Sequence, residues 1–107
     1  MSDIDDLKAS AEYLRSEPKV VFDPYPVYDD RVMRALNTFK PDYDYLEHYA
    51  ELEGKAAADM SLEDLATMYT FIVRGERFCD GHIASFIEDG DLLALVERHI
   101  ELLEKKR

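Results

Sequence analysis

Apolar residues recur at steps of three and four along most of this chain, a period that predicts amphipathic helices. The pattern is clearest in the second half, where it predicts helices over about 62–74 and 91–105. Ser61, followed by Asp64 three residues later, has the spacing of a capping box and predicts where the first of these helices begins. Gly75 stands where a glycine that ends a helix is expected.

Four shorter apolar patterns predict further helices, over 4–16, 30–39, 42–53 and 77–88. Either of two adjacent aspartates, Asp29 or Asp30, can cap the second of them. In the third, four apolar residues share one stripe: Tyr45, Leu46, Tyr49 and Leu52. In the fourth, Phe78 begins the face that is expected to turn inward.

Prolines and glycines divide the chain into two parts, since all four prolines precede residue 42 and all four glycines follow residue 53. A short strand is expected at 19–22, but Pro24 and Pro26 preclude a regular strand beyond that point. The patterns together predict an all-α fold in a single helical domain over 1–107. We expect a compact bundle of five or six helices with an irregular Pro/Tyr-rich segment near 19–28.

The chain of 107 residues has 24 acidic and 13 basic residues, which gives a net charge of −11 at pH 7. Binding to phosphates or to anionic lipids needs clustered Lys and Arg, so neither a nucleic acid nor a membrane surface is expected as a partner. The acidity indicates a soluble protein whose copies repel one another electrostatically. The sharper alternative is an acidic face that docks a basic partner or mimics a nucleic acid.

Cys79 is the only cysteine, so no disulfide can form within the chain, which fits a reducing compartment. The amino-terminal residues lack the basic start and apolar run of a signal peptide, and no apolar run approaches the ~20 residues that cross a bilayer. We therefore expect a cytoplasmic protein. No phosphate-binding glycine loop, nucleotide fingerprint or metalloprotease motif is found, so no cofactor is predicted.

Residue types that carry chemistry concentrate in nine positions, 74–82, with the sequence RGERFCDGH. Such density indicates either a tightly specified junction between two helices or a small site. The candidate residues are Arg74, Glu76, Arg77, Cys79, Asp80 and His82.

The charges of this block allow two interpretations. Glu76 and Asp80 are like charges four residues apart, which is unfavourable unless Arg74 and Arg77 neutralise them. Guanidinium groups suit bidentate pairing with carboxylates, which favours a clamp at the junction. The alternative is that both arginines face a pocket and bind an anion, helped by free N–H groups at the start of the next helix.

The thiol of the block also allows two interpretations. Cys79 and His82 stand three residues apart and can share a helix face, as a thiolate–imidazole nucleophile pair would. Nothing marks a third group that would orient the base, and Phe78 next to the cysteine favours a buried, inert thiol. Zinc held by Cys79, Asp80, His82 and His99 would lack the paired ligand spacing of structural zinc sites, so no metal site is predicted.

Eight of the twelve aromatic residues lie in the first half of the chain. Tyrosine combines a large ring with a polar tip, which suits half-buried positions and interfaces. We expect these rings to cover the helical core. The functional alternative is a groove for a peptide or protein, formed with the Pro24–Pro26 segment.

From residue 67 onward, the chain resembles a family of small prokaryotic domains of unknown function. The resemblance rests on a helix, on the block R-G-E/D-R-F-C-x-G, which here is Arg74–Gly81, and on Gly90 before a closing helix. The part before residue 67 resembles the family only loosely. The resemblance implies a small, mainly helical single domain, and it brings no activity, cofactor or substrate with it.

The expected function is that of a binding or accessory domain that acts through protein–protein contacts rather than as an enzyme. Self-association into a homodimer is one form of this, since the Leu/Val face of 91–103 is broader than a small bundle needs. The first alternative is a small-ligand or enzymatic pocket built from the 74–82 block. The second is the acidic mimic of a nucleic acid.

Overall fold

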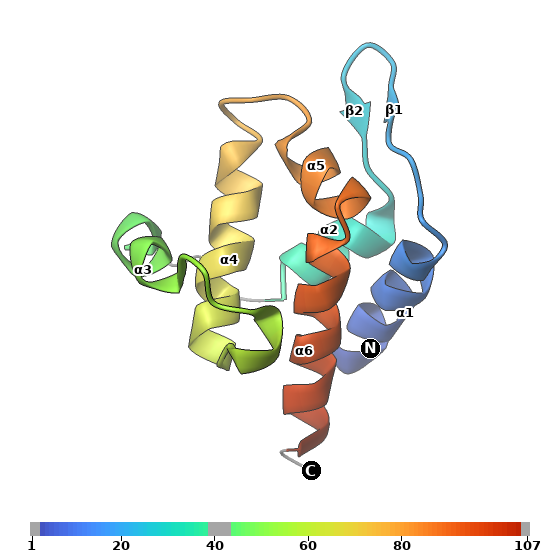
Figure 1. The fold of residues 1–107 in the computed structure, drawn as a ribbon. Helices are drawn as coiled ribbons and strands as arrows, with labels where there is room; N and C mark the ends of the chain where they lie inside the picture. The colour runs from blue at the N-terminus through green and yellow to red at the C-terminus, as the bar shows by residue number, and fades with distance from the viewer. Residues whose placement is uncertain (1–2, 39–43, 106–107) are drawn as a thin grey trace.

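Six α-helices, one 3-10 turn and one small hairpin make up residues 3–38 and 44–105, the part of the chain that the computed structural model describes (Figure 1). The predicted all-α fold is confirmed, and none of the helices described is long and apolar enough to cross a bilayer. The elements in chain order are α1 (Asp3–Arg15), β1 (Val21–Phe22), β2 (Pro26–Val27), α2 (Asp30–Leu36), α3 (Tyr45–Leu52), η1 (Ala57–Asp59), α4 (Leu62–Gly75), α5 (His82–Glu88) and α6 (Asp91–Lys105). The predicted end of the second helix and start of the third fall on 39–43, outside the described residues.

Helix α6 forms the centre of the bundle and packs against α1, α4, α5 and η1. Its buried side chains include Leu92, Leu95 and Val96, which join Leu7 and Leu14 of α1 in one hydrophobic core. The broad apolar face predicted for 91–103 is therefore largely used inside the bundle. Among the described residues, no large apolar side chain of α6 counts as exposed.

Helix α4 begins as its sequence predicts. The Ser61 hydroxyl accepts a hydrogen bond from the Asp64 N–H (3.2 Å), and the Asp64 carboxylate accepts one from the Ser61 N–H (3.1 Å). Lys55 adds an ion pair to the same carboxylate at 2.8 Å. The capping box satisfies N–H groups that a helix start otherwise leaves unpaired. Beyond it, α4 buries Leu65 and Ile72 in the core.

Helix α3 lies beside α4 and buries less than its sequence predicts (Figure 1). Leu52 is buried, and the Tyr49 ring stacks on Phe71 of α4 with centroids 4.0 Å apart. Leu46, predicted to share this stripe, is 67% exposed. The prediction for Leu46 is wrong because α4 covers only a narrow strip of the short α3 helix.

Helix α5 is shorter than predicted, because it begins at His82 rather than near 77. Gly81 adopts φ +93°, a left-handed conformation that a continuous helix cannot contain. The chain therefore makes a turn over 76–81, and Phe78 within it is 86% exposed instead of facing inward. Apolar spacing alone could not distinguish this turn from a first helical turn.

The hairpin contradicts the prediction that the prolines preclude a strand beyond residue 22. Strands β1 and β2 pair antiparallel, with Val21 opposite Val27 and Phe22 opposite Pro26. The Asp23 N–H donates to the Tyr25 carbonyl at 3.0 Å. Since hydrogen-bonded and non-hydrogen-bonded pairs alternate, Phe22 and Pro26 form a non-hydrogen-bonded pair. Pro26 is tolerated there because its missing N–H would have pointed away from β1.

Candidate functional site

The 74–82 block forms the connection between α4 and α5. Arg74 lies in the last turn of α4 and His82 is the first residue of α5. Between them the block divides into a carboxylate that holds the junction and an exposed tip.

Glu76 closes the junction from a half-buried position. Its carboxylate accepts hydrogen bonds from the N–H groups of Gly81 (3.0 Å) and Ile83 (2.8 Å), and from the Tyr28 hydroxyl (2.8 Å). The Tyr28 oxygen in turn accepts the N–H of Ala84 at 3.3 Å. In the part of the chain that the structure describes, none of the bonds to Glu76 comes from an arginine. The carboxylate thus serves as the cap that Gly81, with no side chain, cannot provide for α5.

The environment of this cap changes the pKa of both of its side chains. Burial opposes ionisation of Glu76, but the two backbone N–H donors and the Tyr28 hydroxyl outweigh it, so the pKa of Glu76 lies below its ordinary value. Burial and the bond to Glu76 raise the pKa of Tyr28. Glu76 therefore remains an ionised acceptor, and Tyr28 remains a protonated donor.

Gly75 is required by a close approach rather than by a left-handed turn. A Cβ atom at this position would lie 2.3 Å from the His82 ring. Helix α4 does end at Gly75, but the left-handed glycine of the junction is Gly81. The His82 ring also packs edge-on against Phe71 and Phe86, each with a centroid distance of 5.2 Å. Its Nε2 atom is buried and has no hydrogen-bond partner among the described residues.

Arg77, Phe78, Cys79 and Asp80 form the exposed tip of the junction. The interpretation of Cys79 as a buried thiol is wrong, since the turn leads it into solvent before α5 begins. Cys79 and His82 therefore do not share a helix face, and the polar atom recorded near the sulfur is the Asp80 carbonyl oxygen at 3.9 Å. Within 3–38 and 44–105, no group of three His, Cys, Asp or Glu side chains is placed to hold a metal ion.

The two arginines of the block lie beside a different feature. Arg74 and Arg77 line a recess of about 110 Å³ together with Asn37 and Thr70. The Arg74 guanidinium carbon also lies 5.4 Å from the centre of the Tyr45 ring. Cys79, Asp80 and His82 do not line this recess, so the six candidate residues do not converge on one cavity.

The most exposed apolar surface lies on the hairpin and the adjoining tip. Among the described residues, six large apolar side chains are exposed, and five of them gather here. The sixth is Leu46 on α3. We call these five the hairpin patch: Val21 (65% exposed), Phe22 (52%), Tyr25 (68%), Val27 (62%) and Phe78 (86%).

The hairpin and the tip lie next to each other. The Phe22 ring would be 3.1 Å from a Cβ atom placed on Gly81, three residues beyond Phe78. Both segments project from the same end of the bundle, opposite the carboxyl end of α6 (Figure 1). The patch is therefore assembled from two segments that are far apart in the sequence.

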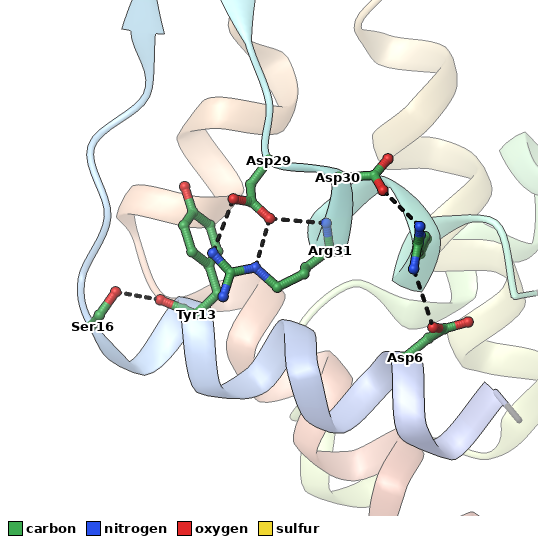
Figure 2. A network of polar contacts seen from close by, with 7 residues as sticks. Asp6, Tyr13, Ser16, Asp29, Asp30 and Arg31 are labelled. Atoms are coloured by element: carbon green, nitrogen blue, oxygen red, sulfur yellow. Dashed lines mark hydrogen bonds and ion pairs between the residues drawn. The ribbon is translucent and has the colours of Figure 1, made fainter. Parts of the chain in front are cut away.

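Polar contacts fix the base of the hairpin on both sides. Tyr28 follows β2 directly and binds Glu76 and α5 as described above. Asp29 caps α2 and forms a two-pronged ion pair with Arg31, at 2.8 and 3.0 Å, whose guanidinium lies over the Tyr13 ring of α1 (Figure 2). The hairpin thus projects from a base attached to α1, α2 and α5.

A second ion-pair network ties α2 to α1 close to this base. Arg34 of α2 lies between Asp30, at 3.0 Å, and Asp6 of α1, at 4.0 Å (Figure 2). Arg34 and Asp30 are exposed and Asp6 is half-buried, and an exposed ion pair contributes little to stability. The two pairs link α2, which follows the hairpin, to α1.

The sequence predicted that the rings of the 19–28 segment cover the core, with a groove that includes Pro24–Pro26 as the alternative. The structure instead exposes Phe22 and Tyr25 on a hairpin, and the groove stays a prediction. The exposure of Val21, Val27 and Phe78 was missed, because nothing local in the sequence shows that no helix covers them. The role of Tyr28 was also missed, since its partner Glu76 is 48 residues away.

Comparison with protein-family models identifies a match that spans both halves of the chain. A family of unknown function, DUF6508, matches residues 2–105. The chain belongs to this family. Comparison with curated proteins finds no match, and comparison with solved structures finds none either.

Membership of DUF6508 confirms the resemblance at the level of a family of unknown function. That the block at 74–81 marks the family stays a prediction. Because DUF6508 has no assigned activity, the function of this member must be argued from its own surface and junction.

Proposed function

We propose that this protein is a binding or accessory domain that acts through protein–protein contacts, with the hairpin patch as its contact surface. The observation that carries this proposal is the gathering of five of the six exposed large apolar side chains at one end of the bundle. Single exposed apolar residues are ordinary, whereas their concentration at one end of a molecule favours an interaction site there.

The composition of the patch supports the same conclusion. Two of its five members are phenylalanines and one is a tyrosine, residue types that are enriched in the cores of protein interfaces. The charged residues of the same two segments, Lys19, Asp23, Arg77 and Asp80, are exposed beside the patch residues.

The attachment of the hairpin to the bundle supports a role as a contact surface that is ordered before a partner binds. Binding costs less when the contact surface is already ordered, because fewer side chains and loops lose freedom on association. Tyr28 and Asp29 hold the base of the hairpin to three helices, so β1 and β2 are presented from a fixed position.

The junction favours binding over catalysis. Catalysis by the 74–82 block would need its carboxylates, thiol and imidazole to face one cavity. Glu76 is instead occupied as a helix cap, and Cys79 points into solvent away from the recess of Arg74 and Arg77. We further propose that the protein acts in the cytoplasm, because an exposed lone thiol is best kept reduced there.

Site-specific photo-crosslinking in cells of the source organism tests the proposal. A photoreactive phenylalanine analogue in place of Tyr25 should give a discrete adduct that mass spectrometry assigns to one protein. The same analogue in place of Leu46, which is equally exposed on α3, is the matched control. Equal, diffuse labelling from both positions would contradict the proposed contact surface.

A further inference from the structure

The geometry points to a second copy of this chain as the partner of the hairpin patch, joined through the free edge of β1. This inference rests on the proposed function, because it identifies the partner at the same surface. It is carried by two independent observations, the charges that border the patch and the hydrogen-bonding edges of the hairpin.

The charges around the patch balance although the chain as a whole is strongly acidic. The segments that form it, 18–28 and 77–80, contain two cations, Lys19 and Arg77, and two anions, Asp23 and Asp80. All four side chains are exposed, and none forms an ion pair within the described part of the chain. The net charge of −11 thus belongs to the remaining surface.

This distribution favours self-association at the patch over other partners. Two copies repel each other wherever their acidic surfaces meet, but no net charge opposes contact through the patch. In a two-fold arrangement the same surface faces itself, so the cations of one copy can approach the anions of the other. A strongly basic partner would be attracted to the acidic remainder of the surface instead.

The hairpin has one edge that can pair and one that is blocked. Phe22 and Pro26 form a non-hydrogen-bonded pair, so the N–H and C=O of Phe22 point away from β2. On the opposite edge, Pro26 offers a carbonyl but no N–H. Strand β1 also lies on the side of the hairpin away from α4 and α5 (Figure 1). Antiparallel pairing of β1 with β1 of a second copy would therefore join two short hairpins into one four-stranded sheet.

One side chain of the free edge strand suits burial in such a dimer. Val21 and Val27 are directly opposite each other and so lie on the same face of the hairpin. Both are more than 60% exposed in the single chain. The extended sheet would have the strand order β2–β1–β1–β2, so Val21 would lie next to its copy across the two-fold axis and Val27 would flank it on the outer strand.

Sedimentation of the full chain is the first test. We expect a reversible equilibrium between monomer and dimer from micromolar to submillimolar concentration. Val21→Lys should weaken dimerisation at least tenfold by adding like charges across the axis, whereas Leu46→Lys should leave it unchanged. Retained helical circular dichroism would show that both variants fold. A monomer at every concentration overturns the inference, as does a dimer that Val21→Lys leaves intact.

Two further measurements need no substitution. The Phe22 amide should exchange with solvent more slowly at high protein concentration than at low, and equal rates would contradict pairing through β1. A nitroxide on Cys79, the only thiol, should give a label-to-label distance shorter than the 41 Å long axis of the molecule. A longer distance would place the contact elsewhere on the surface.

Crosslinking and sedimentation together distinguish failure of self-association from failure of the proposed contact surface. If crosslinking from position 25 gives an adduct of twice the chain mass, both proposals stand. An adduct with a different protein, together with monomeric sedimentation, overturns self-association and leaves the proposed contact surface intact. Diffuse crosslinking with monomeric sedimentation overturns both.

Discussion

Large apolar side chains are buried in the helical core and exposed in the hairpin patch. In the core, Leu7, Ile72 and Leu92 are fully buried, whereas in the patch Val21 and Phe78 are mostly exposed. Burying a large apolar side chain contributes roughly 1.5–3 kcal/mol to folding, so the core residues account for stability. The patch residues contribute little to it. The comparison teaches that the stability of the fold does not account for the exposed apolar residues of the hairpin, which favours the proposed contact surface.

The largest expected effect comes from exchanging side chains in both regions for alanine. Ile72→Ala should lower the free energy of unfolding by about 2–5 kcal/mol, because it removes a buried side chain and leaves a cavity. Phe78→Ala should change it by less than about 0.5 kcal/mol, as exposed sites do. Urea denaturation measures both. Similar losses for the two variants would mean that Phe78 is packed and that the patch is not free surface.

The buried imidazole of the core should make stability depend on pH. Burial lowers the pKa of His99 to about 4, and its Nδ1 lies 3.3 Å from the Tyr69 hydroxyl. Below pH ~6.5 His99 takes up a proton in the unfolded chain, whereas in the folded chain it stays neutral until about pH 4. The stabilisation is therefore fully present above this window, and it is lost as pH falls through the window. The loss should be on the order of 3 kcal/mol over the whole window.

Denaturation curves between pH 7 and pH ~5, where carboxylates remain largely ionised, isolate this effect. His99→Gln should flatten the slope, and His48→Gln, at an exposed position, should retain it. An unchanged slope in His99→Gln would assign the pH dependence to other groups.

The contact between Gly75 and His82 gives a smaller effect, at the boundary between the two regions. Gly75→Ala should lower the free energy of unfolding by ~1–3 kcal/mol, because the new methyl group would overlap the His82 ring. Adding His82→Ala should recover part of the loss, since the overlap disappears. A double variant in which the two losses simply add would indicate that the ring does not lie against Gly75.

The smallest of these effects concerns the bond that attaches the hairpin to α5. Tyr28→Phe and Glu76→Gln should each cost about 0.5–1.5 kcal/mol, and the double variant should cost less than their sum because the same bond is lost. The contribution of Glu76 is present above its unfolded pKa and is lost as pH falls through its lowered folded pKa. Strict additivity in chemical denaturation would show that the two side chains do not interact.

Much of the helical framework could be predicted from the sequence, because its signals are local. The spacing of Leu65, Tyr69 and Ile72 and the Ser61–Asp64 box are properties of one segment, and α4 and α6 appear where those signals place them. The start of α5 was missed because Phe78 continues the apolar spacing, while only the backbone of Gly81 reveals the turn.

The candidate site was less predictable, since its parts meet only in three dimensions. Glu76 was expected to pair with arginines next to it in the sequence, but its hydroxyl partner is Tyr28 at the base of the hairpin, 48 residues away. Exposure of Val21 and Phe78 likewise depends on where the helices lie. A single sequence contains no signal for either relation.

The Tyr28 hydroxyl has a consequence for detecting whatever the hairpin binds. It accepts the N–H of Ala84 and donates to Glu76, which holds the N–H groups of Gly81 and Ile83. A ligand that tilts or stiffens the hairpin therefore alters the surroundings of three amide protons it need not touch. The chemical shifts of these three amides should therefore report by NMR, in the unmodified protein, whether a ligand is bound to the hairpin.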